Sequence, residues 1–320
     1  MNCYYLIFIF ILVSGNSDKC IREGILSKET LAALSKKIIP DINKKSKGDA
    51  GRIGVLGGSD EYSGAPYFGA YSALRVGADL VYIITSETAA PIIKAYSPDL
   101  IVYSYLSKKH SSKISEILKK LDVVVIGPGL GREDEQIKLI FDVIETCRSL
   151  KKPIVIDADG LYALSKNITV LLNYPKPGVI LTPNGREAAR LIEAINSNAT
   201  PWYNYWGGNV SVLVKGYEDT CYTSETKFNW SLFGGGSDRR AAGQGDILAG
   251  ALGTFYNWAL KSNLCENGNS TQLAQSVAIY AAAKFTRTCN TFAYVENGRN
   301  MIASDMLNKI HTAFDELFSS

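Results

Sequence analysis

The sequence is poor in the residues that bind metal ions or build disulfide frameworks. Its 320 residues include two histidines and six widely scattered cysteines. No two cysteines have the Cys-x-x-Cys spacing that structural zinc sites use. We therefore expect neither a zinc site nor a disulfide framework, and we assign no residue as a metal ligand.

Several common nucleotide-binding motifs are also missing. No glycine is followed by lysine, as the Walker phosphate loop requires, and no G-x-G-x-x-G follows the first predicted strand. The His-Arg-Asp and Asp-Phe-Gly motifs of protein kinases are absent as well. These absences exclude a Walker-type ATPase and a protein kinase, and they disfavour a Rossmann hydride-transfer enzyme.

The chain has little excess charge of either sign. Its formal net charge is +3, and its basic clusters lack the interleaved aromatic residues of a surface that binds single-stranded nucleic acid. With 46% hydrophobic and 20% charged residues, it has the composition of a globular protein with a large core. We expect small-molecule partners, no nucleic acid and no stable membrane insertion.

The amino terminus carries an apolar run, residues 3–13, followed by Ser14 and Gly15. This run is shorter than a membrane span and is typical of a secretory signal peptide, although it lacks a basic flank. We expect residues 1–17 to be a signal peptide, which predicts the secretory pathway or endoplasmic reticulum. The alternative is an amino-terminal strand or a different start site, with the protein in the cytoplasm or mitochondrion.

Strand and helix patterns alternate along most of the chain. The expected strands are continuous apolar runs, which indicates a parallel sheet buried on both faces. They span residues 52–56, 80–85, 100–105, 123–126, 154–156 and 179–181. The expected helices span residues 27–39, 67–77, 89–96, 108–120, 133–150, 162–165 and 185–195. The sequence predicts an α/β fold with a central, mostly parallel sheet flanked by helices on both faces, forming one domain over residues 18–320.

The remaining segments complete this predicted domain. Residues 220–224 and 227–233 alternate around a polar turn, which predicts a β-hairpin. Residues 196–209, rich in tryptophan and tyrosine, are expected to form a helix end and a surface insertion. Helices are expected after Asp246 and over residues 270–287 and 304–318.

Glycines, carboxylates and amides follow four consecutive strands. They occur in residues 127–132, 157–160, 182–184 and 215–219. Ligand sites of open α/β sheets lie beyond the carboxyl ends of the strands, so these side chains are candidates for one shared site. Each segment alone is also compatible with a turn or a helix cap.

A glycine-rich loop, residues 234–246, leads into an apolar helix. Its glycines let backbone N–H groups approach a phosphate, the following helix directs its positive end there, and Arg239 and Arg240 add positive charge. Asp246 at the inner end fits a general base that takes a proton from a substrate hydroxyl. The alternative is that Asp246 only caps the helix.

Gly243-Gln244-Gly245-Asp246 resembles the catalytic loop of the ribokinase-like superfamily. Other segments resemble one branch of it, the ATP-dependent NAD(P)H-hydrate dehydratases. These are residues 47–59, 62–68, 72–80, 97–102, 127–132, 157–161 and 181–184. The resemblance implies a ribokinase-like fold and a hydro-lyase that uses ATP to dehydrate (S)-NADHX and (S)-NADPHX. Phosphorylation of the C6 hydroxyl and elimination of phosphate would yield NADH or NADPH, ADP and phosphate.

The resemblance also implies roles for individual residues. Asp246 would be the catalytic base, and the amides of Gly243 and Gly245 would stabilise the transferred phosphoryl group. The implied ATP contacts are Lys215, Gly216, Tyr217, Glu218, Asp219, Gly236, Ser237, Asp238, Arg239, Arg240, Ala241, Ala242, Gly243, Gln244 and Gly245. The implied contacts of the hydrated dinucleotide are Gly129, Gly131, Asn184, Gly185, Arg186, Glu187, Ala188, Ala189, Arg190 and Asp246.

Cofactors and partners follow from the same resemblance. ATP would be the phosphoryl donor, with Mg²⁺ held largely by the nucleotide. A separate epimerase would supply the correct epimer, because the epimerase domain fused to many bacterial relatives is missing here. A homo-oligomer is one of the oligomeric states left open.

The sequence departs from the family pattern in two places. Ala241 and Ala242 stand where Cys-Gly is usual, and Gly185 and Ala188 stand where a larger residue and an aromatic one are typical. The second departure concerns affinity for the substrate more than the type of reaction. Two alternatives are therefore retained: a small-molecule kinase of the same fold with a stable phosphorylated product, and a nucleotide-binding pseudoenzyme.

Overall fold

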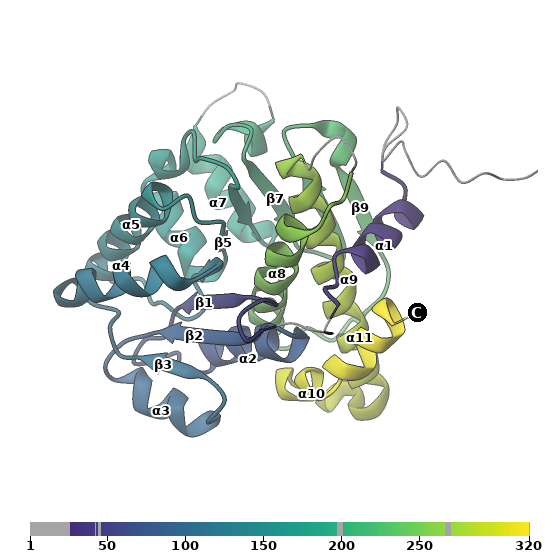
Figure 1. Ribbon diagram of the computed structural model, residues 1–320, viewed down its shortest axis with the longest axis horizontal. Helices are drawn as coiled ribbons and strands as arrows, with labels where there is room; N and C mark the ends of the chain where they lie inside the picture. Colours follow the sequence, from purple (N-terminus) through teal and green to yellow (C-terminus); the bar gives the residue numbers. More distant parts are fainter. Residues whose placement is uncertain (1–25, 42, 44–45, 197–200, 266–269, 320) are drawn as a thin grey trace, which may run out of the picture.

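The computed structural model describes residues 26–41, 43, 46–196, 201–265 and 270–319, and these are organised around one sheet (Figure 1). The sheet has nine strands in the order β3-β2-β1-β4-β5-β6-β7-β8-β9. The strands are β1 (Arg52–Leu56), β2 (Leu80–Ile84), β3 (Ile101–Tyr103), β4 (Val123–Ile126), β5 (Ile154–Ile156), β6 (Val179–Leu181), β7 (Val210–Val214), β8 (Glu218–Tyr222) and β9 (Trp230–Phe233). Pairing is parallel from β3 to β7 and antiparallel from β7 to β9. The predicted mostly parallel α/β architecture is confirmed.

Helices cover both faces of the sheet, because its parallel strands are apolar on both sides (Figure 1). In β4, for example, Val125 belongs to the core on one face and Val124 to the core on the other. The first face packs against α1 (Lys28–Lys37), α2 (Gly64–Val76), α3 (Ala89–Tyr96), α8 (Gln244–Lys261), α9 (Thr271–Asn297), α10 (Ala303–Asn308) and α11 (Ile310–Phe318). The second packs against α4 (Ser111–Lys120), α5 (Asp134–Ser149), α6 (Ala158–Lys166) and α7 (Gly185–Ile195).

Some predicted boundaries and one predicted insertion differ from the structure. Helix α6 starts at Ala158, four residues before the predicted start at residue 162, and α9 continues to Asn297. The expected surface insertion at residues 196–209 is wrong for Trp206, whose side chain is 1% exposed. Its indole Nε1 donates a hydrogen bond to the Ile168 carbonyl at 2.8 Å, so burial of the ring draws this segment into the core.

The amino-terminal end of α8 is held firmly against α2. A Cβ atom at Gly250 would lie 1.8 Å from the carbonyl oxygen of Gly69, so the two helices touch backbone to backbone. The Ser72 hydroxyl lies within hydrogen-bond distance of the Gly69 and Ile247 carbonyls, at 2.9 and 3.0 Å. This close packing fixes the place where the glycine-rich loop enters α8.

Several predictions concern the ends and the surface of the chain. The predicted signal peptide, residues 1–17, lies outside the described residues. Within the described part, no helix is long and apolar enough to cross a membrane.

Cys147, Cys221 and Cys289 are buried free thiols, whereas Cys265 is disulfide-bonded.

Candidate functional site

The loops that follow the parallel strands meet at one edge of the sheet. The Gly58 amide after β1 donates to the Pro128 carbonyl after β4 at 3.0 Å. The Gly131 amide donates to Asp159 Oδ2 at the start of α6, at 3.1 Å. Further along the edge, Asn184 and Lys215 pair as a parallel bridge. The structure thus brings together the polar strand ends that the sequence singled out.

The glycine-rich loop has a backbone that suits an anion. Gly234, Gly235 and Gly236 have φ angles of +78°, +73° and +76°, a region that side chains rarely adopt. Gly243 caps α8 with φ +91° and supplies no side-chain cap. The N–H groups in the first turn of a helix have no partner four residues back, so the amide of Gly245, which lines a cavity, is a candidate for binding an anion.

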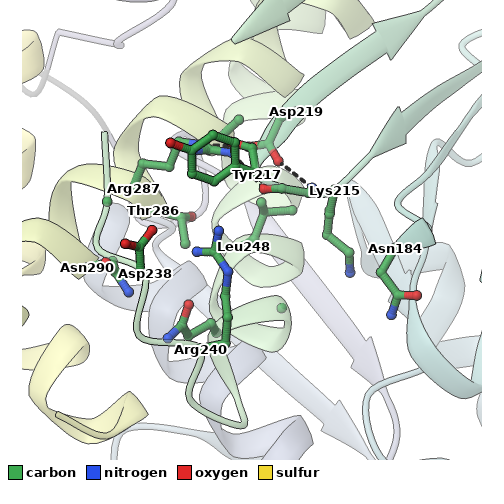
Figure 2. Close-up of a pocket in the computed structure, with 15 residues that line it drawn as sticks. Asn184, Lys215, Tyr217, Asp219, Asp238, Arg240, Leu248, Thr286, Arg287 and Asn290 are labelled. Carbon is green, nitrogen blue, oxygen red and sulfur yellow. Dashed lines mark hydrogen bonds and ion pairs between the residues drawn. The ribbon is translucent and has the colours of Figure 1, made fainter. Parts of the chain in front are cut away.

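Beside this helix end lies a cavity of about 610 Å³ (Figure 2). Its lining combines the loop after β7, the glycine-rich loop, α8 and α9. The lining residues are Asn184, Lys215, Gly216, Tyr217, Asp219, Gly236, Asp238, Arg240, Gln244, Gly245, Leu248, Ala283, Thr286, Arg287 and Asn290. The guanidinium of Arg240 reaches into the middle of the cavity, and the side chain of Lys215 extends down one wall.

Most of the predicted ATP contacts surround this cavity, but others lie outside its lining. Those outside are Glu218, Ser237, Arg239, Ala241, Ala242 and Gly243. Sequence reasoning missed the wall formed by Leu248 on α8 and by Ala283, Thr286, Arg287 and Asn290 on α9. Nothing in their spacing distinguishes them from ordinary helix positions, so tertiary packing alone reveals them.

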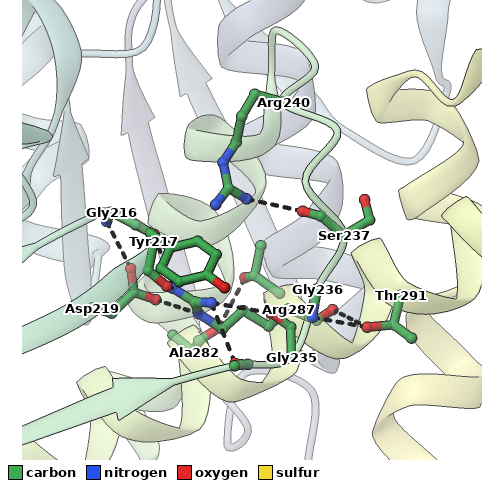
Figure 3. A network of polar contacts seen from close by, with 12 residues as sticks. Gly216, Tyr217, Asp219, Gly235, Gly236, Ser237, Arg240, Ala282, Arg287 and Thr291 are labelled. Atoms are coloured by element: carbon green, nitrogen blue, oxygen red, sulfur yellow. Dashed lines mark hydrogen bonds and ion pairs between the residues drawn. The ribbon is translucent and has the colours of Figure 1, made fainter. Parts of the chain in front are cut away.

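Arg287 ties two parts of the cavity wall together (Figure 3). Its Nε donates to Asp219 Oδ2 at 2.7 Å, and both side chains are largely buried. The remaining guanidinium N–H groups donate to the carbonyls of Gly216 and Tyr217 after β7 and of Gly234 and Gly235 after β9. One side chain therefore holds the glycine-rich loop against the β7–β8 turn.

Two further side chains of α9 shape the same loop. The Thr291 hydroxyl accepts a hydrogen bond from the Gly236 amide at 2.9 Å, and the Asn290 Oδ1 accepts one from the Ser237 amide at 2.5 Å. The Asn290 Nδ2 also donates to the Arg239 carbonyl. These contacts hold residues 236–239 against α9, with Gly236, Asp238 and the following Arg240 lining the cavity.

Asp246 stands in the first turn of α8 with unusual electrostatics. Burial, followed by the nearby Asp157 carboxylate, raises the pKa of Asp246 from 3.8 to about 8. Lys215 opposes this rise, while Asp159 and Glu187 add to it. A carboxylate with a pKa close to the working pH is suited to accept and return a proton.

Lys215 lies among the carboxylates of this edge. Its Nζ is 2.5 Å from Asp157 Oδ1, and Asp157 is 1% exposed. Burial alone would lower the pKa of the Lys215 ammonium, but the carboxylates of Asp157, Glu187 and Asp246 together raise it. Burial also raises the pKa of Glu187, against the opposing effect of Lys215. The lysine is therefore a buried cation at the centre of an acidic cluster.

The predicted dinucleotide contacts lie along the neighbouring stretch of the sheet edge. Gly129, with φ +64°, leaves no room for a side chain, because a Cβ would lie 2.8 Å from Tyr62. Asn184 caps α7. Its Oδ1 accepts hydrogen bonds from the backbone amides of Arg186 and Glu187, and the Glu187 carboxylate accepts one from the backbone amide of Asn184. Of this predicted group, Asn184 lines the cavity, whereas Asp246 is outside the lining and follows Gly245, which belongs to it.

A cluster of cations surrounds the Tyr162 ring at this end. The charged groups of Arg132, Lys166 and Arg190 lie 4.6, 4.9 and 5.3 Å from the ring centroid. Arg132 also pairs with Asp159 at 2.9 Å. The cluster brings positive charge from the loop after β4, from α6 and from α7 to the same place.

The described residues contain no group of three or more histidine, cysteine or acidic side chains that could hold a metal ion. The carboxylates that line the cavity are Asp219, already bound by Arg287, and Asp238. A divalent cation here would therefore depend on ligands brought by a bound molecule.

Comparisons with known proteins agree with this geometry. The family model described as NAD(P)H-hydrate dehydratase matches residues 53–311. The chain belongs to the NAD(P)H-hydrate dehydratase family. An Aedes aegypti protein named ATP-dependent (S)-NAD(P)H-hydrate dehydratase is 44% identical over 311 residues, covering 95% of this chain and 91% of the relative. The Homo sapiens protein of that name is 38% identical over 309 residues, covering 93% and 87%.

Solved structures confirm that this NAD(P)H-hydrate dehydratase family member has the predicted ribokinase-like fold. An Enterococcus faecalis ribokinase-like superfamily protein matches with a TM-score of 0.73 at 19% identity, over 90% of this chain and 95% of that one. The ADP/ATP-dependent NAD(P)H-hydrate dehydratase of Bacillus subtilis, co-crystallized with ATP/Mg²⁺, matches with a TM-score of 0.66 at 20% identity. That match covers 91% of this chain and 98% of the other.

Proposed function

We propose that this protein uses ATP to dehydrate (S)-NADHX and (S)-NADPHX to NADH and NADPH, releasing ADP and phosphate. The observation that carries the proposal is Asp246, a half-buried acid with a pKa of about 8 in the first turn of α8, next to Gly245, which lines the cavity. The family relationship supports the same reaction.

The reaction needs a base that takes the proton of the C6 hydroxyl and hydrogen-bond donors that hold the transferred phosphoryl group. Asp246 takes the proton of the C6 hydroxyl as its oxygen attacks the γ-phosphorus, and the bond from that phosphorus to ADP breaks. Amides of Gly243 and Gly245 stabilise the charge on the transferred group. Phosphate then leaves with the electrons of the C6–O bond, and loss of a proton from the adjacent ring carbon restores the double bond.

ATP occupies the cavity in this proposal. Arg240 reaches into the cavity and supplies positive charge for the phosphates. Tyr217, 65% exposed, forms an edge-to-face pair with Phe233 at a centroid distance of 5.1 Å. The Tyr217 ring lies over the cavity and offers a flat surface for the adenine base.

Magnesium enters with the nucleotide. The cavity walls do not offer a ready set of protein ligands among the described residues, and Mg²⁺ commonly keeps several waters while bound by substrate phosphates. Asp238 is the lining carboxylate left to hold a metal-bound water. The metal would neutralise charge on the phosphates during transfer.

The hydrated dinucleotide occupies the edge between the loop after β4 and α7. Gly129 lies against Tyr62 and Gly131 against Ser59, both in the loop after β1, and Asn184 caps α7 next to the cavity. The cations around Tyr162 give the phosphates of the dinucleotide a positively charged surface. Gly185, where a Cβ would meet nothing within 4 Å, leaves this side of the site open.

The decisive experiment supplies hydrated NADPH with ATP, and separately with ADP, and follows recovery of the nicotinamide absorbance. We expect recovery with ATP and formation of ADP and phosphate in equal amounts. Accumulation of a stable phosphate ester would instead support the small-molecule kinase, and binding of ATP without turnover would support the pseudoenzyme. A separate epimerase that supplies the (S) form belongs to the same proposal, and adding such an enzyme should let the (R) form be consumed.

Asp246→Asn tests the proposed base. The change keeps the shape of the side chain but removes its ability to accept the proton, so kcat should fall by about 10²- to 10⁴-fold. The Kd for ATP, measured by titration calorimetry, should change by no more than a few-fold. Asp99→Asn, on the loop before β3, is the control and should retain activity. Near-normal turnover by Asp246→Asn would contradict the assignment.

A further inference from the structure

The inference concerns the acidic cluster under the first turn of α8, and it rests on the proposed function. A Cβ atom at Gly245 would lie 3.4 Å from Lys215 Nζ and 3.7 Å from Asp157 Oδ2. The ion pair of these two side chains is therefore packed against the residue that precedes Asp246. Asp157 is 1% exposed, and the Lys215 side chain, which also lines the cavity, is 18% exposed.

The backbone around Lys215 fixes the ammonium further. The Lys215 amide donates to the Pro183 carbonyl at 2.8 Å, and the residue forms an isolated parallel bridge with Asn184 beyond the paired residues of β6 and β7. Its Nζ donates to Asp157 Oδ1 at 2.5 Å. The ammonium is thus bound to a buried carboxylate beside the first turn of α8.

We propose that Asp157 and Lys215 are positioning residues for Asp246: Asp157 holds the lysine ammonium under the first turn of α8, and that ammonium stabilises the ionised form of Asp246. The charged groups that face Asp246 are Asp157 and Asp159 at the start of α6, Glu187 on α7 and Lys215 after β7. Lys215 is the cation of this set. It remains protonated while Asp246 accepts the hydroxyl proton, so it changes the ease of the step without taking part in the transfer.

The two members of the pair act on Asp246 with opposite signs, which gives a specific test. The acid limb of the pH profile of kcat/KM for hydrated NADPH reports ionisation of Asp246. Lys215→Met should move this limb to higher pH by about 1 unit or more, because a neighbouring opposite charge is lost. Asp157→Asn keeps a side-chain oxygen that can accept the lysine hydrogen bond but removes a neighbouring like charge, so it should move the limb to lower pH. If the pair only stabilised the fold, the two variants would not shift the acid limb in opposite directions.

Two controls separate charge from folding. Lys215→Arg retains the cation and should keep the limb close to its wild-type position. Lys138→Met removes an exposed lysine of α5 and should leave the profile unchanged. An increase in the KM for ATP in Lys215→Met with an unshifted pH limb would overturn the inference and leave Lys215 as a phosphate ligand.

A direct measurement on Asp246 covers the case in which Lys215→Met does not fold. The carboxyl ¹³C resonance of Asp246, identified by its loss in Asp246→Asn, should titrate near pH 8. In Lys215→Arg the resonance should titrate close to its wild-type pH, and in Asp157→Asn it should titrate at lower pH; an unchanged titration in Asp157→Asn would overturn the inference. A wild-type protein that restores no nicotinamide absorbance would instead overturn the proposed function, whatever the titration of Asp246.

Discussion

Arg239 and Arg240 show how adjacent residues of one loop acquire different surroundings. Both were predicted as ATP contacts, yet Arg240 lines the cavity and Arg239 does not. The Arg239 Nε is buried and has no hydrogen-bond partner among the described residues. Position within a motif therefore does not by itself say which of two arginines meets the ligand.

This difference predicts unequal effects of the two substitutions. Arg240→Ala should raise the KM for ATP about 10-fold or more, because a hydrogen bond between charged groups contributes about 1.5–3 kcal/mol. Arg239→Ala is the matched control and should raise the KM less. Steady-state kinetics with ATP as the varied substrate gives both values. Equal effects of the two substitutions would contradict the role drawn from the cavity.

At the scale of elements, the contact of α8 with α2 decides where the glycine-rich loop ends. Gly250 is required there, because a Cβ would lie 1.8 Å from the Gly69 carbonyl oxygen. The Arg287 network then joins the loop to the β7–β8 turn. These contacts link helices far apart in the sequence, so the cavity depends on how α2, α8 and α9 are packed.

Substitution of glycine by alanine in two helices tests this packing. Gly250→Ala should lower the free energy of unfolding by about 1–3 kcal/mol, because the added methyl group forces α8 away from α2. Gly185→Ala in α7, where a Cβ meets nothing within 4 Å, should be neutral or stabilise the protein by up to about 1 kcal/mol. Urea unfolding monitored by circular dichroism measures both. A Gly250→Ala variant as stable as wild type would show that α8 moves without cost.

For the whole molecule, the proposed base lowers stability at the pH where it works. The pKa of Asp246 is higher in the folded protein, about 8, than its ordinary value of 3.8. A carboxyl group shifted in this direction favours folding below its unfolded pKa, and that contribution is lost as the pH rises through the folded pKa. The buried acidic cluster therefore opposes folding increasingly between about pH 4 and pH 8.

Asp246→Asn should for this reason stabilise the protein at alkaline pH. The stability difference between variant and wild type should grow from about pH 5 to about pH 8, because asparagine does not ionise there. Each unit of pKa shift corresponds to about 1.4 kcal/mol, so a small part of the shift is measurable. Urea unfolding of both proteins at several pH values gives the difference. A difference that is constant with pH would argue against a raised pKa.

Local patterns in the sequence determined the order of strands and helices and the parallel sheet. Buried strands such as β4 are uniformly apolar, and Asn184 and Glu187 form a capping box at the start of α7. Both the strand and the start of the helix can therefore be predicted without tertiary contacts. The motif Gly243-Gln244-Gly245-Asp246 likewise identified the candidate base. Each of these signals lies within a few consecutive residues.

Only the tertiary structure decided which residues share the site with Asp246. Asp157 and Lys215 are 58 residues apart, and Arg287 follows Asp219 by 68 residues, yet each pair forms a short ion pair. The burial of Trp206 likewise depends on tertiary contacts and could not be predicted from the local sequence. Periodicity reports which face of an element is apolar, but the distance between charged groups on different elements is set by packing across the whole fold. Burial by that packing, and then the distances to the neighbouring charges, determine the proton affinity of Asp246.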